Sequence, residues 1–231
     1  MNVGALRVLA VQECAILPTG PNGLRHVEIY TMQGLVTLLW HGEPDSEKVV
    51  LCGGGAMGGL LGPGDGFFHD LGVTLARDHG VATVRVGYRQ PNDLAMCVGD
   101  LVAGAMLAER NGAQRFLTMG HSFGGAVAIG AAIEPSPIAE SVCGVVTLAT
   151  QSAGCEDAAL LKKRPLLLVH GTHDEILPAW SSEMVNEIAG GHGELHLLPG
   201  AGHVLREHGA SAWLREHVTR WVVSTLSAPR G

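Results

Sequence analysis

From about residue 48 onward, short apolar runs alternate with longer segments of helical pattern, and this alternation restricts the folds open to the chain. Apolar runs bounded by glycine or proline predict buried strands, whereas apolar residues at three- to four-residue spacing predict helices. Buried strands separated by helices indicate a parallel sheet that helices cover on both faces. We therefore expect an α/β fold with a mostly parallel sheet of about eight strands.

The expected elements follow one another without a break in composition. A hairpin around Gly34 is expected to be antiparallel and to lead into the parallel sheet. The predicted strands are residues 25–33, 34–42, 48–54, 81–89, 114–120, 142–150, 165–171 and 194–200. The predicted helices are residues 67–80, 91–112, 122–134, 179–190 and 208–226. Residues 1–24 are of uncertain structure, with an edge strand as the interpretation, and residues 1–231 are expected to form one domain.

Composition narrows the classes of function. Hydrophobic residues make up 46% of the 231 residues and charged residues 16%, which is enough apolar surface for a sizeable core. The net charge is −7, and the longest basic run is the Lys-Lys-Arg at 162–164, so no nucleic-acid partner is expected. The N-terminus lacks a basic segment and a cleavage signal, and no apolar run is long enough to span a bilayer. The sequence therefore favours a soluble protein without a membrane partner.

Cysteine usage indicates the compartment. The five cysteines are Cys14, Cys52, Cys97, Cys143 and Cys155. They form no C-x-x-C pair and leave an odd count, so neither a disulfide framework nor a structural zinc site is expected. A reducing cytoplasm is the expected location.

One serine stands between two glycines at the end of a predicted strand. The segment Gly120-His121-Ser122-Phe123-Gly124 matches G-x-S-x-G and lies between a strand and a helix, which is the context that a nucleophile elbow requires. The glycines remove Cβ atoms that would clash where strand and helix nearly touch. Ser122 is either a nucleophile or a simple helix N-cap, and its context favours the nucleophile.

With this motif in place, residues 25–226 resemble the α/β-hydrolase superfamily, whose members carry a nucleophile, an acid and a histidine in that order. The resemblance implies Asp174, in LLLVHGTHDEILP, as the acid and His203, in LHLLPGAGHVLRE, as the base. The chain separations leave room for two βα units and then one, so the three side chains can meet at the carboxyl ends of neighbouring strands. Glu175 and Asp157 are alternatives for the acid.

Other polar residues receive ordinary structural interpretations. His170 and His173 flank Gly171-Thr172 and suggest a metal, but no third ligand stands at a sensible spacing, so loop packing is favoured. We expect neither a metal nor another cofactor. Salt bridges and helix caps are the interpretation of Arg85, Arg89, Asp93 and Asp100.

Acyl transfer also needs hydrogen-bond donors for a developing oxyanion. One is expected to be the backbone N–H of Phe123, and the other comes from the loop CGGGAMGG, which resembles a His-Gly-Gly-Gly signature with Cys52 in place of the histidine. This alignment makes Gly54 the expected second donor and Gly55 the alternative. Cys52 is interpreted as a small buried hydrophobe at a position where a thiol reagent would inhibit. The glycine-rich loop over 53–66 is hypothesised to form a wall of the site or to move.

The resemblance also bears on access to the site. Many members of the superfamily insert a helical cap between the strand after the nucleophile helix and the strand before the acid. Residues 151–164 leave room there for one short helix only, so we expect an uncapped, open site. In this the chain resembles the small dienelactone-hydrolase-like and esterase-like members, although dienelactone hydrolases use cysteine where Ser122 stands.

The expected function is a serine hydrolase that cleaves ester or thioester bonds of small to medium acyl substrates through an acyl-serine intermediate. An amidase or peptidase of the same fold is one alternative, although amides have poorer leaving groups. A non-catalytic ligand-binding protein is another, but it would not need all of Ser122, Asp174 and His203. Cofactor-free perhydrolysis would use the same residues. The expected partner is a small-molecule ester or thioester, and the sequence carries no signal of oligomeric state.

Overall fold

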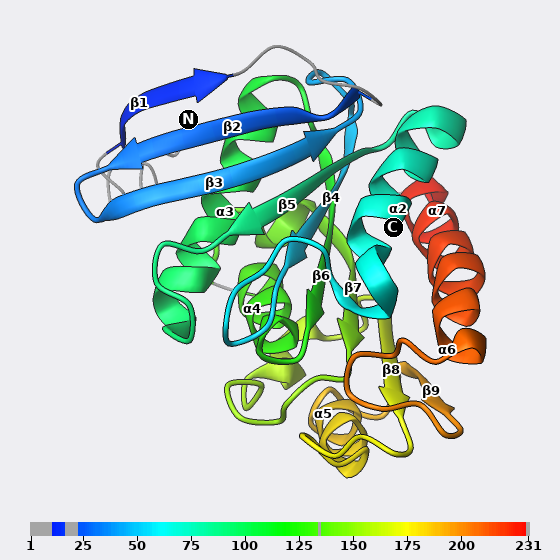
Figure 1. The fold of residues 1–231 in the computed structure, drawn as a ribbon. Coiled ribbons are helices and arrows are strands. Elements are labelled where there is room, and N and C mark those ends of the chain that lie inside the picture. Colours follow the sequence, from blue (N-terminus) through cyan, green and yellow to red (C-terminus); the bar gives the residue numbers. More distant parts are fainter. Residues whose placement is uncertain (1–10, 17–22, 134, 230–231) are drawn as a thin grey trace.

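A computed structural model describes residues 11–16, 23–133 and 135–229, and a nine-stranded sheet forms its centre (Figure 1). The strands are β1 (Val11–Ile16), β2 (Arg25–Thr31), β3 (Gly34–His41), β4 (Lys48–Gly53), β5 (Ala82–Gly87), β6 (Arg115–His121), β7 (Val142–Leu148), β8 (Leu166–Gly171) and β9 (Glu194–Leu198). The helices are α2 (Pro63–His79), α3 (Leu94–Arg110), α4 (Phe123–Ala132), α5 (Trp180–Ile188), α6 (His208–Trp213) and α7 (Thr219–Ser227). Two short 3-10 helices, η2 (Ala139–Ser141) and η3 (Ala158–Leu161), and a π-helical turn, η4 (Leu214–Val218), complete the set.

The sheet joins an antiparallel part to a parallel part. Its strand order is β1-β2-β3-β5-β4-β6-β7-β8-β9. Strands β1, β2 and β3 pair antiparallel, β3 also pairs antiparallel with β5, and the remaining pairs from β5 to β9 are parallel. The carboxyl ends of β4, β6, β8 and β9 therefore lie at one edge of the sheet, where the loops after these strands meet.

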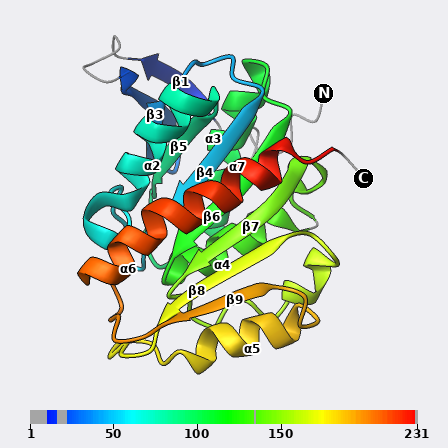
Figure 2. The same cartoon turned by 90° about the vertical axis from the view of Figure 1, so that its right-hand side faces the viewer.

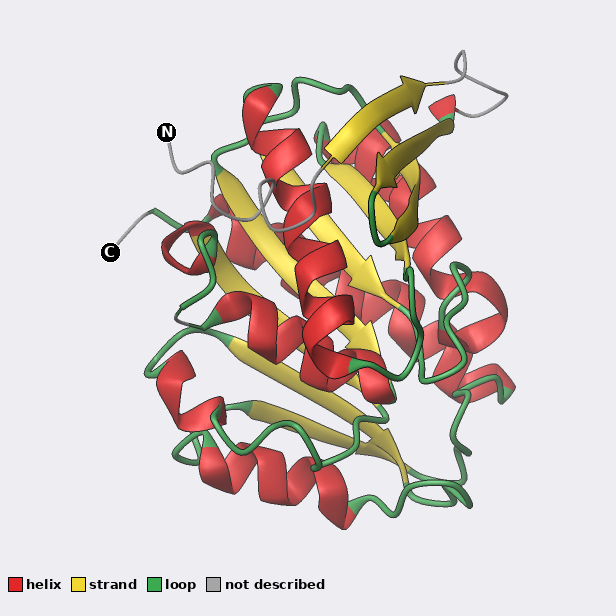
Figure 3. Cartoon of the chain, turned by 90° about the vertical axis from the view of Figure 1, so that its left-hand side faces the viewer, coloured by secondary structure: helices red, strands yellow, loops and turns green. Residues whose placement is uncertain are grey.

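Helices cover both faces of the sheet, as the sequence predicts. Helices α2, α6 and α7 lie on one face (Figure 2), and α3, α4 and α5 pack on the other (Figure 3). Successive residues of a strand point to opposite faces, so Val49 and Leu51 of β4 enter one core while Val50 and Cys52 enter the other. The apolar runs of β4 to β8 are continuous because these strands are buried on both faces, whereas the edge strand β9 is largely exposed or partly buried.

The predicted elements are all present, with ends that differ by a few residues. The edge strand expected within residues 1–24 is β1, which makes nine strands in place of about eight. The hairpin at Gly34 is antiparallel, with Thr31 paired to Gly34. Helix α2 includes three residues of positive φ at 64–66 and is regular from Phe67, where the predicted helix begins.

Residues 151–164 contain only η3, so no helical cap is inserted there, as expected. The predicted helix over 208–226 is a run of α6, η4 and α7, in which one π-helical turn interrupts the α-helical pattern. Within the described ranges, no helix is both long and apolar enough to cross a membrane.

Candidate active site

Ser122 alone makes the turn between β6 and α4. Its φ is 57° and its ψ is −123°, a strained conformation for a residue with a side chain. Its backbone N–H donates to the Leu148 carbonyl of β7 at 2.8 Å, and its carbonyl accepts from the Gly125 N–H at 2.9 Å. Ser122 occupies the N-cap position of α4, but its side chain makes no capping hydrogen bond to the helix.

The glycines of G-x-S-x-G are sterically required. A Cβ on Gly120 would lie 1.7 Å from the Gly124 carbonyl oxygen, and a Cβ on Gly124 would lie 2.4 Å from the Gly54 carbonyl oxygen. Neither contact is possible for real atoms, and backbone cannot swing aside as a flexible side chain can. The strand, the helix and the loop after β4 therefore touch through backbone around Ser122.

Asp174 and His203 meet in the loops after β8 and β9. His203 Nδ1 donates to Asp174 Oδ2 at 2.7 Å, and the Asp174 side chain is fully buried. The alternatives for the acid, Glu175 and Asp157, are exposed, and neither contacts His203. The structure thus pairs the predicted base with the predicted acid.

Asp174 also organises its own loop. The backbone N–H groups of Ile176 and Leu177 each donate to Oδ1 at 2.8 Å, so the carboxylate caps a turn as well as binding His203. Burial by itself raises the pKa of Asp174, but the hydrogen bonds from Leu177, His203 and Ile176 outweigh it and hold that pKa below its ordinary value. Asp174 is therefore a carboxylate at neutral pH, and it fixes the His203 proton on Nδ1, which leaves Nε2 as the basic nitrogen.

His121, which precedes Ser122, contacts the predicted base His203 in a way that the sequence did not predict. The rings of His121 and His203 pack with centroids 4.9 Å apart, and His121 Nε2 donates to the His203 carbonyl at 2.9 Å. Burial lowers the pKa of His121 to about 4, so the ring is neutral at physiological pH. This contact brings the base loop against the turn that carries Ser122.

The Ser122 hydroxyl itself makes no hydrogen bond to any residue in the described part of the chain. Catalytic hydrogen bonds are often long in a site without substrate and tighten when substrate binds. The hydroxyl is thus free of partners beside His121, whose ring packs against His203.

His170 has a different environment from the loop packing that we expected. It is the next-to-last residue of β8 and is completely buried, with Nε2 3.1 Å from Asp174 Oδ2 and Nδ1 2.7 Å from the Ser182 hydroxyl. His173 is exposed and contacts Thr172. Within the described ranges no group of three or more acidic, histidine or cysteine side chains is arranged to hold a metal ion.

The loop after β4 lies directly beside Ser122. A Cβ on Gly55 would stand 3.7 Å from the Ser122 Cβ, whereas a Cβ on Gly54 would meet the carbonyl oxygens of Gly58 and Gly59. The Tyr88 hydroxyl donates to the Gly54 carbonyl at 3.3 Å. Gly55 forms an isolated antiparallel bridge with Gly58, whereas the backbone N–H groups of Gly54 and Phe123 have no acceptor among the described residues. Both predicted donor segments therefore have free N–H groups, and Gly55 is placed against Ser122.

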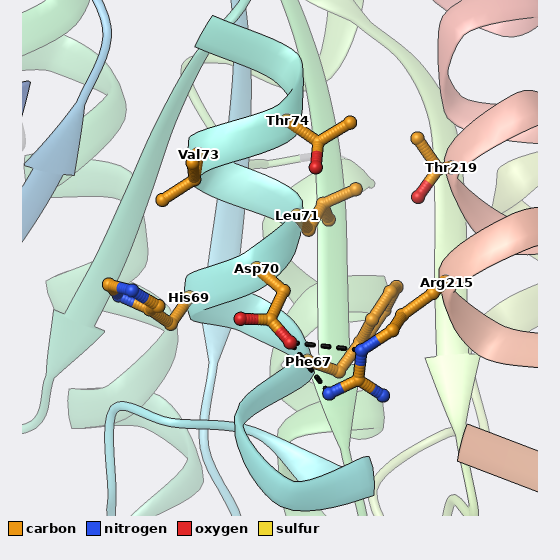
Figure 4. Close-up of a pocket in the computed structure, with 8 residues that line it drawn as sticks. All are labelled: Phe67, His69, Asp70, Leu71, Val73, Thr74, Arg215 and Thr219. Atoms are coloured by element: carbon orange, nitrogen blue, oxygen red, sulfur yellow. Dashed lines mark hydrogen bonds and ion pairs between the residues drawn. The ribbon is translucent and has the colours of Figure 1, made fainter. Parts of the chain in front are cut away.

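The glycine-rich first turn of α2 contacts the loop that carries His203. The Gly64 N–H donates to the carbonyl of Val204, the residue after His203, at 2.7 Å. The Gly64 carbonyl accepts from Arg215 Nη2 at 2.9 Å, and Arg215 also pairs with Asp70 of α2 (Figure 4). Asp70 and Arg215 line a cavity of about 380 Å³ between α2 and α7 that contains none of the three predicted catalytic side chains. Through these hydrogen bonds the segment around Gly64 holds the loop that carries His203 in place. Movement of the glycine-rich loop stays a prediction.

The remaining charged residues follow the sequence interpretation with one exception. Asp93 caps α3 by accepting from the Met96 N–H at 3.0 Å, and Arg89 forms a buried ion pair with Asp100 at 2.5 Å. The expectation of a salt bridge or cap was wrong for Arg85. This side chain is buried, donates through Nη1 to the Leu60 carbonyl at 3.1 Å, and has no carboxylate partner among the described residues.

Cys52 is buried beside Arg85, in agreement with its interpretation as a small hydrophobe. Burial raises the pKa of the thiol to about 12, which outweighs the opposite effect of the Arg85 charge. A protonated, covered thiol is a poor nucleophile, so Cys52 is not a reactive part of the site.

Comparison with solved structures agrees with the fold. Est1E from Butyrivibrio proteoclasticus superposes with a TM-score of 0.71 at 16% identity, covering 88% of this chain and 99% of that one. A cold-adapted esterase from an Arctic intertidal metagenomic library gives a TM-score of 0.71 at 14% identity, covering 92% and 100%. A dienelactone hydrolase from Anabaena variabilis gives 0.63 at 17% identity, covering 94% and 99%.

No protein-family model and no curated protein matches the chain in sequence. The likeness in structure nevertheless covers nearly all of this chain and of its neighbours. The protein has the α/β-hydrolase fold.

Proposed function

We propose that the protein is a serine hydrolase that cleaves ester or thioester bonds of small to medium acyl substrates through an acyl-Ser122 intermediate. The observation that carries this proposal is the free hydroxyl of Ser122 on a strained turn, at the same sheet edge as the hydrogen-bonded pair of His203 and Asp174. The names of solved structures with the same fold include esterases and a dienelactone hydrolase, which supports the reaction class.

The proposed reaction has two halves, formation and hydrolysis of an acyl-serine, and His203 acts as base and then as acid in each. His203 Nε2 takes the proton of Ser122 as Oγ attacks the acyl carbonyl, and Asp174 stabilises the imidazolium that forms. The oxyanion accepts hydrogen bonds from the Phe123 N–H and from the N–H of Gly54 or Gly55. His203 then protonates the leaving alcohol or thiol, and water activated by the same base hydrolyses the acyl-serine.

The surroundings of the site favour an apolar acyl group. Large apolar side chains are exposed on the loops that carry the proposed oxyanion donors and the acid. These are Met57 (94% exposed), Leu61 (63%) and Ile176 (69%), with Trp180 (53%) at the start of α5. With no cap over this edge, the side chains are available to bind an acyl chain. We expect esters of medium-length acyl groups to react faster than acetyl esters.

A panel of p-nitrophenyl acyl esters and acyl thioesters, with matched anilides, tests the proposal. We expect wild-type turnover of esters and thioesters above anilides, and a fall of at least about 10³-fold in kcat for Ser122→Ala. Ser224→Ala, at an exposed serine on α7, is the matched control and keeps full activity. Absence of wild-type turnover across the panel, with unchanged ligand affinity in Ser122→Ala, would instead support a binding protein.

A further inference from the structure

Asp174 has a second histidine partner besides the base. His170 Nε2 lies 3.1 Å from Asp174 Oδ2, the same oxygen that accepts from His203 Nδ1 at 2.7 Å. His170 stands at the end of β8, four residues before Asp174, and both side chains are completely buried. The two imidazoles thus approach one carboxylate oxygen from β8 and from the loop after β9.

The partners of His170 determine which nitrogen carries its proton. Nε2 faces two acceptors, Asp174 Oδ2 and the Leu177 carbonyl at 3.0 Å, so it must be the N–H donor. Nδ1 faces the Ser182 hydroxyl of α5 at 2.7 Å. In the neutral ring Nδ1 is an acceptor, so the Ser182 O–H donates to it. The hydroxyl thereby selects the tautomer that points N–H at Asp174.

The carboxylate of Asp174 is fully occupied by this arrangement. Oδ1 accepts from the N–H groups of Ile176 and Leu177, and Oδ2 accepts from His170 and His203. A carboxylate has about four lone-pair sites, so no site is left for water. A carboxylate held at four points cannot rotate away from His203 without breaking a buried hydrogen bond.

We propose that His170 is a positioning residue for Asp174: with its tautomer selected by Ser182, it fixes the carboxylate oxygen that receives the His203 proton and shares the charge of that oxygen. The inference rests on the proposed function for its catalytic consequence, but the hydrogen-bond chain from Ser182 through His170 and Asp174 to His203 stands on the geometry.

If His170 shares the negative charge of Asp174 Oδ2, its removal shifts the proton affinity of His203 in one direction. A purely structural role of His170 predicts no such shift. Removing the His170 donor leaves Oδ2 with more negative charge for His203, which stabilises the imidazolium form of the base. His203 then loses its proton at a higher pH. The titratable groups that face His170 are Asp174 and His203 from their loops and His121 from the end of β6. Of these groups, only Asp174 contacts the His170 ring through a hydrogen bond.

Three variants isolate this hydrogen bond. His170→Leu removes the donor and keeps an apolar side chain in the space, whereas His170→Gln retains an N–H close to the position of Nε2. Ser182→Ala removes only the hydroxyl that selects the tautomer, so it tests the chain even if His170→Leu does not fold. His41→Leu is the matched control, since His41 is also a fully buried histidine at a strand end but lies far from Asp174, against α2.

The primary measurement is a ¹⁵N and ¹H NMR titration of the histidine side chains, which does not depend on activity. We expect the His170 ring to be the Nε2–H tautomer and the His203 midpoint to rise by about 0.5–1 pH unit in His170→Leu. Ser182→Ala shifts it less in the same direction, and His170→Gln and His41→Leu leave it unchanged. In ester hydrolysis, the acid limb of kcat/KM follows the same shifts, and kcat of His170→Leu falls about 10-fold to 100-fold with KM unchanged.

An Nδ1–H tautomer of His170 would overturn the proposal. So would His203 midpoints in His170→Leu and Ser182→Ala equal to that of the wild type, with a lowered melting temperature as the only effect. If the wild type hydrolyses no ester, the proposed function fails, while the NMR titration still decides the role of His170.

Discussion

Two clusters of buried polar groups lie on this sheet, and they differ in how completely they are hydrogen-bonded. The site cluster comprises Asp174, His170, His203 and His121. In it, each of these side chains has a hydrogen-bond partner, and Asp174 keeps its charge because donors outweigh burial. The α2 cluster comprises His41, Cys52 and Arg85, and in it both ring nitrogens of His41 and the Nε of Arg85 have no partner among the described residues.

The consequences for ionisation differ between Asp174, which stays charged, and the α2 cluster. In the α2 cluster burial acts almost unopposed: it lowers the pKa of His41 to about 4, raises that of Cys52 to about 12, and lowers that of Arg85. Each group is moved toward its neutral form. Burial alone therefore moves a group toward its neutral form. Asp174 stays charged because its hydrogen bonds outweigh the effect of burial.

The largest effect is expected where the site cluster is broken at its centre. Asp174→Asn places an amide among four donors, so its NH₂ opposes one of them and His203 loses its tautomer preference. We expect kcat for ester hydrolysis to fall about 10⁴-fold, with little change in KM. Steady-state kinetics with a reactive acyl ester measure this, and a fall below about 10-fold would show that Asp174 is not the acid.

The site cluster also depends on backbone contact around Ser122, which the α2 cluster does not need. Gly124→Ala forces a Cβ to within 2.4 Å of the Gly54 carbonyl oxygen, so the elbow and the loop after β4 must separate. We expect a loss of about 3 kcal/mol or more in the free energy of unfolding. Gly209→Ala, where a Cβ meets nothing within 4 Å, is the control in urea unfolding. Equal stabilities for the two variants would contradict the close approach.

The α2 cluster makes a prediction about pH and stability. The pKa of His41 is about 4 in the folded protein against an ordinary value of 6.5, so the unfolded chain binds its proton at a higher pH than the folded one. The stability from keeping this ring neutral is complete above about pH 6.5 and is lost as the pH falls toward 4, a loss on the order of 3 kcal/mol.

The matched variant is His41→Leu, which has no proton to bind. Urea unfolding at pH 7 and pH 4.5 is expected to show a smaller loss of stability for this variant than for the wild type. Parallel losses in both proteins would mean that His41 is protonated freely in the folded state.

The smallest effect is expected at Cys52. Its thiol is covered and its pKa is about 12 against an ordinary 9.0, which lowers the thiolate fraction about 10³-fold at neutral pH. Iodoacetamide at pH 7.5 should leave Cys52 unmodified in the folded protein and alkylate it in urea, as peptide mass spectrometry detects. Rapid native modification with loss of activity would place Cys52 in an accessible part of the site.

Much of the fold was predictable because its strands are buried on both faces. Continuous apolar runs such as 165–171 mark such strands directly. Ser122 and Asp174 follow two of them, and His203 follows the partly exposed edge strand β9. The contacts that complete the site were not predictable in the same way. His170 reads as an ordinary loop histidine, because its partner Ser182 lies on a separate helix and only the folded chain brings them together.

Arg85 is a second residue whose hydrogen-bond partner could not be predicted from the sequence. A charged residue in a strand predicts a partner of opposite charge. No local pattern indicates that the partner of the Arg85 guanidinium is the Leu60 carbonyl, with no carboxylate beside it among the described residues. The choice between Gly54 and Gly55 likewise depends on the path of the loop. Motif alignment favours Gly54, but the folded loop places Gly55 against Ser122.

The most direct test of the account is labelling of the folded protein with a fluorophosphonate probe, followed by peptide mass spectrometry. A nucleophile activated by His203 and Asp174 predicts one adduct, on Ser122, that is lost in Ser122→Ala and forms far more slowly in Asp174→Asn. A folded wild-type protein that takes up no probe, or that carries the adduct on a different serine, would contradict the assignment of Ser122 as the nucleophile.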